Sequence, residues 1–310
     1  MSSRHESFLN TMLMLFFIMA IFATSVVHAN GCDDQFVKGQ RPIPVNPVMK
    51  TRLTAVCEPN GFESMNWGVS RSGLWSAEHL TPQRVRDGKR IKRVDSFHEE
   101  MSVPVADRAT LNDFLRSGYD RGHLSPNKDF GDSKSQEACF SLANMVAQNP
   151  DNNRNLWEGV ESAVRQYVLD HGDVYIITGP IFPGHGQQAE FLRRRVMIPI
   201  NMYKIVYDPR LNKASVYLTK NAPGMAWESK SVSEISELAQ IDFFPWMSDS
   251  DKRNARLDLP TPTPHGHGGH SEGGGQSEGG QGSGYSHAGS EVGGALRAAH
   301  YAHMAARFFH

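Results

Sequence analysis

Two polar stretches constrain this chain more than any other feature of its sequence. Tyr119–Phe130 reads YDRGHLSPNKDF, and Ser141–Arg165 reads SLANMVAQNPDNNRNLWEGVESAVR. If the second stretch is helical from about Asn152, four of its side chains recur every four residues along one slowly drifting stripe. These side chains belong to Asn153, Trp157, Glu161 and Arg165. The spacing predicts a helix that presents a polar row to one cleft, with the Trp157 ring packed beneath.

His123 must reach that cleft from a different element. Gly122 and Pro126 on either side of it indicate a strand that passes into a loop. We therefore expect a cleft between a strand-loop and a helix.

The residue types define a chemistry. An imidazole with a pKa near neutrality can take a proton from water. A neutral amide oxygen can hold a hard cation such as Mg²⁺, which keeps most of its waters. Guanidinium groups offset the charge that develops on a phosphate during its transfer. Together these groups predict metal-assisted hydrolysis of a phosphodiester.

Three motifs in fixed order carry a family resemblance: DRGHLSP, then SLANM with QNPDNNRNLWEGVE, then YIITGP followed by IPINMYKIV. The region from about Trp67 to about Pro245 resembles the DNA/RNA non-specific endonuclease family, which includes Serratia-type secreted nucleases and mitochondrial endonuclease G. The resemblance implies an α+β fold with a ββα-metal nuclease core, whose central, mostly antiparallel sheet is flanked by helices.

The resemblance also implies a role for each polar residue. His123 would be the general base, and Asn153 would be the single direct protein ligand of Mg²⁺, for which Mn²⁺ could substitute. Glu161 would hydrogen-bond a water held by the cation, while Arg121 and Arg165 would clamp the phosphate. DNA and RNA would both be substrates, cleaved to leave 5′-phosphate ends.

The family uses one further basic residue upstream of the motif, for which Arg93 is the candidate. The resemblance also allows a homodimer, although no dimer surface can be identified in the sequence.

Each of these residues also has a purely structural interpretation. His123 alone could be a core histidine, and Asn153 could cap the helix, although Asp151 or Asn152 can do that instead. Glu161 and Arg165 could form a surface pair worth a few tenths of a kcal/mol.

Asp120 could be mistaken for a metal ligand. We instead expect an ion pair or hydrogen bonds there that hold the loop, because buried carboxylates need such partners.

The first 29 residues have the pattern of a secretory signal peptide. Arg4 precedes an apolar run from Met12 to Val27, and Val27 and Ala29 are the small residues that signal cleavage favours. The run is short for a membrane span, which needs about 20 residues. We expect cleavage after Ala29, export to a periplasmic or extracellular compartment, and no stable membrane insertion afterwards.

Export makes the three cysteines informative. In an oxidising compartment, Cys32 and Cys57 could close a loop worth about 3 kcal/mol. Cys139 lies in an apolar run, and we expect it to be a buried free thiol.

The formal charge of −1 shows no overall basic signature of nucleic-acid binding. A nuclease needs only a locally basic cleft. Two basic clusters could contact phosphate or could simply be solvated. They are Arg84, Arg86, Lys89, Arg90, Lys92 and Arg93, and then Arg193–Arg195.

Periodicity predicts the other elements. Residues 66–81 alternate as two strands around Arg71–Gly73, and residues 82–118 form a long connection. Residues 173–180 form a buried strand, and residues 198–208 and 214–220 pair around a turn at Pro209–Asn212. Ser231 and Glu234 open a short helix, and FFPWM at 243–247 completes the core.

From about Pro260 the composition becomes Gly- and His-rich. The sequence thus divides into a signal peptide (1–29), an endonuclease domain (30–260) and a low-complexity tail (261–310), which we expect to be disordered. The tail is either a metal-binding or pH-responsive segment or a solubilising tether. An alternative function is a non-enzymatic surface protein that binds nucleic acid or metal through it. A third is an enzyme restricted to preferred sites, with or without an inhibitory partner.

Overall fold

The computed structural model describes residues 31–184 and 186–263. The predicted signal peptide and nearly all of the predicted tail lie outside these residues. No described helix combines the length and the apolar character needed to cross a membrane.

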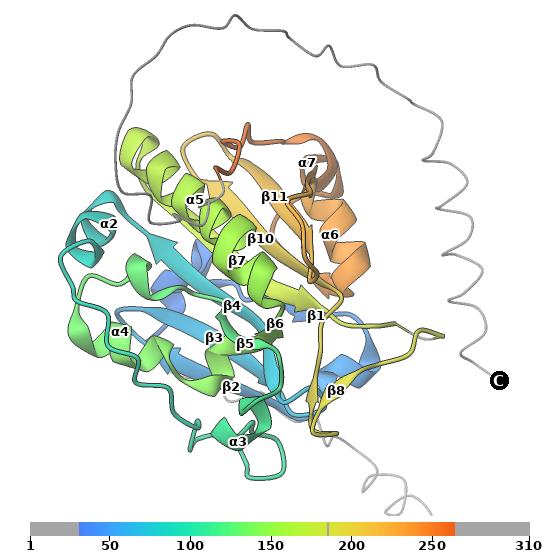
Figure 1. The fold of residues 1–310 in the computed structure, drawn as a ribbon. Coiled ribbons are helices and arrows are strands. Elements are labelled where there is room, and N and C mark those ends of the chain that lie inside the picture. The colour runs from blue at the N-terminus through green and yellow to red at the C-terminus, as the bar shows by residue number, and fades with distance from the viewer. Residues whose placement is uncertain (1–30, 185, 264–310) are drawn as a thin grey trace, which may run out of the picture. The chain divides into compact units, whose positions relative to one another are not determined.

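A seven-stranded sheet forms the centre of the fold (Figure 1). Every neighbouring pair in it is antiparallel. In spatial order the strands are β12 (Trp227–Lys230), β11 (Lys213–Lys220), β10 (Asn201–Asp208), β7 (Val174–Ile181), β4 (Ser72–Leu80), β3 (Phe62–Trp67) and β2 (Leu53–Glu58). The expected α+β class with an antiparallel central sheet is confirmed.

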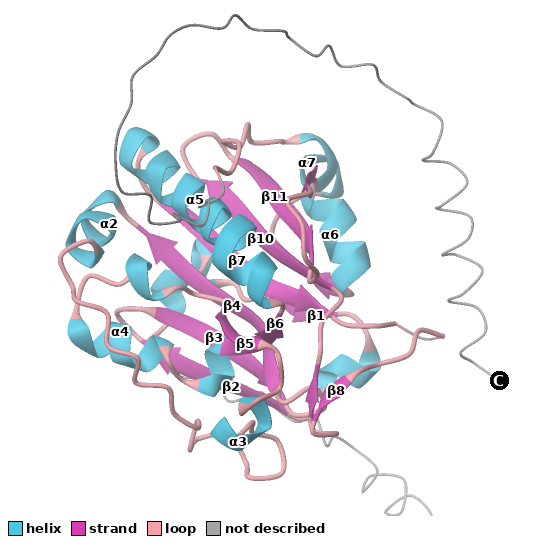
Figure 2. Ribbon diagram, viewed as in Figure 1, coloured by secondary structure: helices cyan, strands magenta, loops and turns pink. Residues whose placement is uncertain are grey.

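Both faces of the sheet are buried because side chains alternate along each strand. On β7, Ile176 packs toward one core cluster and Ile177 toward the other. Helix α5 (Glu158–His171) covers the first face, and α6 (Val232–Ala239) covers the second (Figure 2). Helix α5, which carries part of the polar row predicted from the sequence, therefore lies on one face of the sheet.

Smaller elements complete the chain. The short strands are β1 (Ile43–Pro44), β5 (Asp120–His123), β6 (Met145–Gln148), β8 (Phe191–Leu192), β9 (Val196–Met197) and β13 (Ile241–Asp242). The remaining α-helices are α2 (Pro82–Gly88), α3 (Leu111–Phe114), α4 (Ser133–Cys139) and α7 (Asp249–Asn254). Short 3₁₀ turns are η1 (Asp33–Gln35), η2 (Val37–Gly39), η3 (Pro47–Lys50), η4 (Asn127–Asp129) and η5 (Leu142–Asn144).

Several local predictions are confirmed. Ser231 and Glu234 form a capping box at the start of α6. Cys32 and Cys57 are joined in a disulfide, and Cys139 is a buried free thiol. Phe243 and Phe244 are buried in the core.

Two local predictions need correction. The hairpin of β3 and β4 turns at 68–71, earlier than predicted, and β3 begins at Phe62. The connection at 82–118 contains α2, which begins with Thr81 as its cap and Pro82 in its first turn. Proline at that position is a helix start signal, because its missing N–H would be unpaired there anyway.

Candidate active site

The site is built from two paired strands and the helix that follows them. Strand β5 pairs antiparallel with β6, with His123 opposite Met145. Gly122 allows the close pairing, because a Cβ atom there would stand 2.1 Å from Gln148 Oε1. Gln148 in turn donates from Nε2 to Asn152 Oδ1 at 2.8 Å. The strand pair and the start of the helix are thus one connected unit.

The helix begins with a π-helical turn, Asn152–Trp157, that continues directly into α5. In a π turn the chain advances about five residues per hydrogen bond, and such turns often occur at functional sites. Asn153 and Glu158, five positions apart, both line the same cleft. Trp157 is fully buried against Leu124, Val146 and Met202, as its predicted packing role requires.

A cleft of about 760 Å³ lies over these elements. Its wall includes four of the predicted site residues, His123, Arg121, Asn153 and Glu161, together with the upstream candidate Arg93. Segments distant in sequence therefore meet here, including α3 and the residues that follow it. Arg165 does not line the cleft.

His123 is buried between aromatic rings. Its ring centroid lies 4.8 Å from that of Phe140 and 5.9 Å from that of Phe97. Burial, with the nearby charges of Arg93 and Arg121, lowers the pKa of His123 to about 3. Its Nε2 atom has no hydrogen-bond partner among the described residues. At neutral pH the ring is therefore uncharged, and its Nε2 atom is buried without a hydrogen-bond partner among the described residues.

Asn153 is oriented by an acid on the neighbouring strand. Its Nδ2 donates to Asp120 Oδ2 at 2.9 Å, and Arg154 forms an ion pair with Asp120 at 2.7 Å. The amide nitrogen is thus engaged on the protein side, which leaves the Asn153 carbonyl oxygen as the group that can bind a cation. Asp120 has the loop-holding ion pair expected of it.

Glu161 and Arg165 have different positions. Arg165 is buried beneath the cleft, where its Nη1 lies 3.0 Å from Asp129 Oδ1 and 3.8 Å from Glu161 Oε2. Burial raises the pKa of Glu161 to about 7, while Arg165 opposes that shift. The resemblance implies that Arg165 clamps the phosphate. In the structure its guanidinium instead pairs with Asp129 beneath the cleft wall.

Arg121 and Arg93 are the two arginines of the predicted site that line the cleft. The Arg121 guanidinium carbon lies 3.9 Å from the centroid of the Phe97 ring. Arg93 donates to Asn127 Oδ1 at 3.3 Å and lies over Phe140. Within the first basic cluster Arg84 is structural, because it donates to the backbone carbonyls of Gly61, His79 and Asp129.

The sequence interpretation missed two partners. Asp129 lies in the first polar stretch and Arg154 directly follows Asn153, yet neither position carries a sequence signal of its role. Both are acids or bases whose partners lie more than thirty positions away. No local spacing signals such pairs.

The donor set fits a hydrated divalent cation. Mg²⁺ accepts few protein ligands and prefers oxygen, and the Asn153 carbonyl and the nearby Glu161 carboxylate provide oxygen at the cleft. Among the described residues, one grouping of three ligating side chains occurs elsewhere, at Cys32, Cys57 and Glu63. Its two sulfurs are joined in the disulfide, so it is not a thiolate site.

A paired strand unit followed by a helix, with an imidazole and an amide facing one cleft, defines a nuclease of the ββα-metal class. The chain belongs to the DNA/RNA non-specific endonuclease family, whose model matches residues 45–250. Members of this family are metal-dependent as a rule.

Named relatives agree with this assignment. Nuclease C1 of Cunninghamella echinulata var. echinulata is 32% identical over 192 residues, which cover 56% of this chain and 76% of the relative. A nuclease of Syncephalastrum racemosum is 41% identical, covering 52% of this chain and 61% of the relative. Human mitochondrial endonuclease G is 39% identical, covering 50% and 56%. The chain thus spans less than two thirds of the length of two of these three relatives.

A solved structure, described as the EndoG/EndoGI complex and the mechanism of EndoG inhibition, shares the fold. Its TM-score is 0.56 at 22% sequence identity, and the match covers 64% of this chain and 88% of that one.

Proposed function

We propose that this protein is an exported endonuclease that hydrolyses phosphodiester bonds of DNA and RNA with Mg²⁺, without sugar specificity, and leaves 5′-phosphate ends. The observation that carries the proposal is the shared cleft of His123 and Asn153. The first offers an unpartnered ring nitrogen, and the second offers an amide oxygen whose orientation Asp120 fixes.

His123 acts as the general base. The neutral ring accepts a proton from the attacking water at Nε2, the atom that lacks a protein partner. Its low pKa keeps it uncharged at neutral pH, and the aromatic rings around it limit the access of bulk water. Burial therefore also makes His123 a weaker base.

Arg121 and Arg93 would bind the phosphate. Both line the cleft, and each is supported by an aromatic ring, Phe97 and Phe140 respectively. Guanidinium groups fixed in this way stabilise the charge that develops on the phosphoryl oxygens.

Asn153 would hold the cation directly, and Glu161 would accept a hydrogen bond from one of its waters. When bound, a divalent cation supplies Lewis-acid stabilisation of the reacting phosphate. Arg165 positions Glu161 from below, because it pairs with both Glu161 and Asp129.

Export is supported by the signal-like pattern at 1–29 and by the disulfide between Cys32 and Cys57, since disulfides persist in oxidising compartments. Soluble periplasmic or extracellular localisation is tested by fractionation of cells that express the full chain. Retention of all the protein in the cytosol would contradict it. A homodimer is tested by light scattering of the purified protein.

The catalytic proposal is tested by incubating plasmid DNA and RNA with the wild type, His123→Ala and Asn153→Ala, with Mg²⁺ or with a chelator. We expect His123→Ala to lower the rate by about 10²- to 10⁴-fold, as loss of a general base does. Matched controls are His171→Ala at the end of α5 and Asn155→Ala, which do not line the cleft. A wild type that degrades neither substrate with Mg²⁺ or Mn²⁺ refutes the proposal.

Removal of residues 264–310 separates this enzyme from a tail-based binding protein. The cleft lies entirely within residues 93–161. Cleavage should therefore survive the truncation, and its loss would favour a function of the tail.

A further inference from the structure

The turn between β8 and β9 carries arginine where the backbone favours other residues. Arg193 and Arg194 have positive φ angles of 46° and 59°, and the Arg195 N–H donates to Leu192 O at 2.8 Å. Positive φ at both central positions is the pattern of a type I′ turn, in which Asn-Gly is strongly preferred. Two arginines occupy the positions instead, although side chains with Cβ atoms are crowded in this conformation. The turn therefore has two arginines at positions where its backbone conformation favours Asn and Gly.

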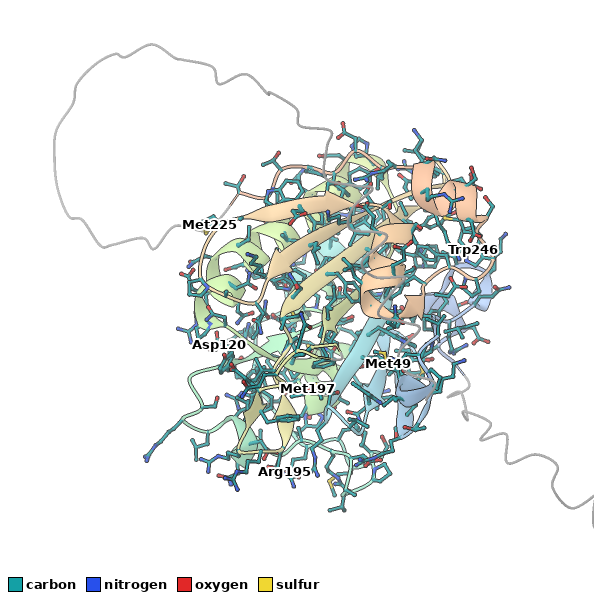
Figure 3. The ribbon with its side chains drawn as sticks, turned by 90° about the vertical axis from the view of Figure 1, so that its right-hand side faces the viewer. Met49, Asp120, Arg195, Met197, Met225 and Trp246 are labelled. Carbon is teal, nitrogen blue, oxygen red and sulfur yellow. A yellow bond between two sulfur atoms is a disulfide. The ribbon has the colours of Figure 1, made fainter. Side chains whose placement is uncertain are left out.

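The turn is fixed beside the cleft. Arg193 donates from Nη2 to Leu115 O at 3.0 Å, and Arg195 pairs with Asp113 at 2.8 Å. Leu115 itself lines the cleft. Figure 1 shows β8 and α3 at the same end of the fold, and Figure 3 places Arg195 and Asp120 toward one end, away from Trp246. The hairpin thus contacts a segment that forms part of the cleft wall.

Arg116 continues the same surface. It lines the cleft, is exposed, and has a φ of 55°. Two other arginines form ion pairs: Arg195 pairs with Asp113, and Arg52 pairs with Asp107. Arg116, Arg193 and Arg194 have no ion pair with a carboxylate in the described part of the chain. Their charge is therefore available to an anionic partner, although the chain as a whole carries a formal charge of −1.

We propose that Arg116, Arg193 and Arg194 form an arginine track that binds the backbone phosphates of the nucleic acid beyond the bond that is cut. The track begins inside the cleft at Arg116 and continues to the exposed turn, so it suits an extended polyanion. Contacts of this kind are independent of sequence and are strongly weakened by salt. This inference rests on the proposed function and adds a second binding surface to it.

The residue preference of a type I′ turn suggests a variant that removes the arginine charges and keeps the turn. Arg193→Asn with Arg194→Gly removes both charges and installs the dipeptide that a type I′ turn favours. We therefore expect its unfolding temperature to be no lower than that of the wild type. Arg193→Gln with Arg194→Gln removes the same charges without altering backbone preference. Binding by this second variant remains informative if the first folds poorly.

The matched control is Arg253→Asn with Lys213→Asn. Both residues are exposed. They lie together at the α7 end of the molecule, where the Ala214 N–H donates to Ala255 O at 2.9 Å. This control makes the same change in net charge at a site remote from the cleft.

Binding of a fluorescent 30-base-pair duplex is measured by anisotropy with chelator present, from 50 to 200 mM salt. Each lost phosphate contact should reduce the salt slope by about 0.9, so the wild type should lose roughly tenfold more affinity over this range than either turn variant. The control should follow the wild type. The proposal would be wrong if the turn variants kept the wild-type dependence of affinity on salt. It would also be wrong if the control variant lost as much of that dependence as the turn variants do. Because no cleavage is needed, this result is separate from the plasmid assay that tests the proposed function.

Discussion

Asn153 donates its side-chain N–H to Asp120 Oδ2 across 2.9 Å, which joins the helix to the strand that carries His123. The same carboxylate is held by Arg154. The contact determines which end of the Asn153 amide is engaged with protein and which remains for a cation. In the proposed site, Asp120 would therefore orient the Asn153 ligand without being a ligand itself.

Replacing Asp120 with Ala should weaken metal activation. Loss of an outer partner of a ligand costs about 10- to 100-fold in metal affinity or activity. The measurement is the Mn²⁺ concentration that gives half-maximal cleavage. Arg154→Ala, which leaves Asp120 in place, should have a smaller effect. An unchanged Mn²⁺ requirement in Asp120→Ala would show that the amide orients itself.

Replacing Arg165 with Met should destabilise the fold. It leaves Asp129 buried without its cation, and breaking a buried pair in this way costs about 3 to 5 kcal/mol. Urea unfolding in chelator measures the loss, and adding Asp129→Asn should recover part of it. Lys128→Ala, which breaks an exposed pair with Glu158, should change stability by less than about 1 kcal/mol. If Arg165→Met kept full stability but lost activity, Arg165 would act on the substrate instead.

Acid should destabilise the protein partly through His123. Its folded-state pKa of about 3 lies below the ordinary value of 6.5, so the unfolded chain binds the proton more readily. The contribution of the uncharged His123 ring to the free energy of unfolding is therefore fully present above pH 6.5, and it decreases as pH falls toward 3. Between pH 7.5 and 4.5 this effect is on the order of 3 kcal/mol. His123→Gln should flatten the dependence of urea unfolding on pH by that amount, and an equal slope in both proteins would refute the buried neutral ring.

The disulfide should contribute to stability and not to chemistry. Cys32 and Cys57 are 25 positions apart, and closing such a loop stabilises a fold by about 3 kcal/mol. Cys32→Ser with Cys57→Ser should lower the thermal midpoint yet keep cleavage at 25 °C, since neither residue lines the cleft. Thermal unfolding with and without reductant checks the first point. A double variant as stable as the wild type would contradict it.

Much of the site could be predicted because its parts lie on two short stretches. The four-residue spacing predicts Asn153 and Glu161 on one side of a helix, and Gly122 and Pro126 predict a strand that passes into a loop at His123. Helix α2 has a start signal in its sequence, Thr81 followed by Pro82, although it lies in the stretch predicted to be a long connection. Arg165 was placed correctly on the helix, but its partner Asp129 lies on a separate turn. Helical periodicity predicts the direction in which a side chain points, but it does not predict which residue from another segment contacts that side chain.

The sequence by itself determined the residue types, their order and the two local elements that carry them, because strand and helix geometry follow from periods of a few residues. Only the tertiary structure decided which groups are buried, which carboxylate holds which cation, and which arginines remain unpaired. Burial of His123, the Asp129–Arg165 pair and the position of the Arg193–Arg194 turn all depend on contacts between distant segments. Such contacts arise when the sheet and helices pack, since burial and Coulomb interactions depend on distance in space and not along the chain.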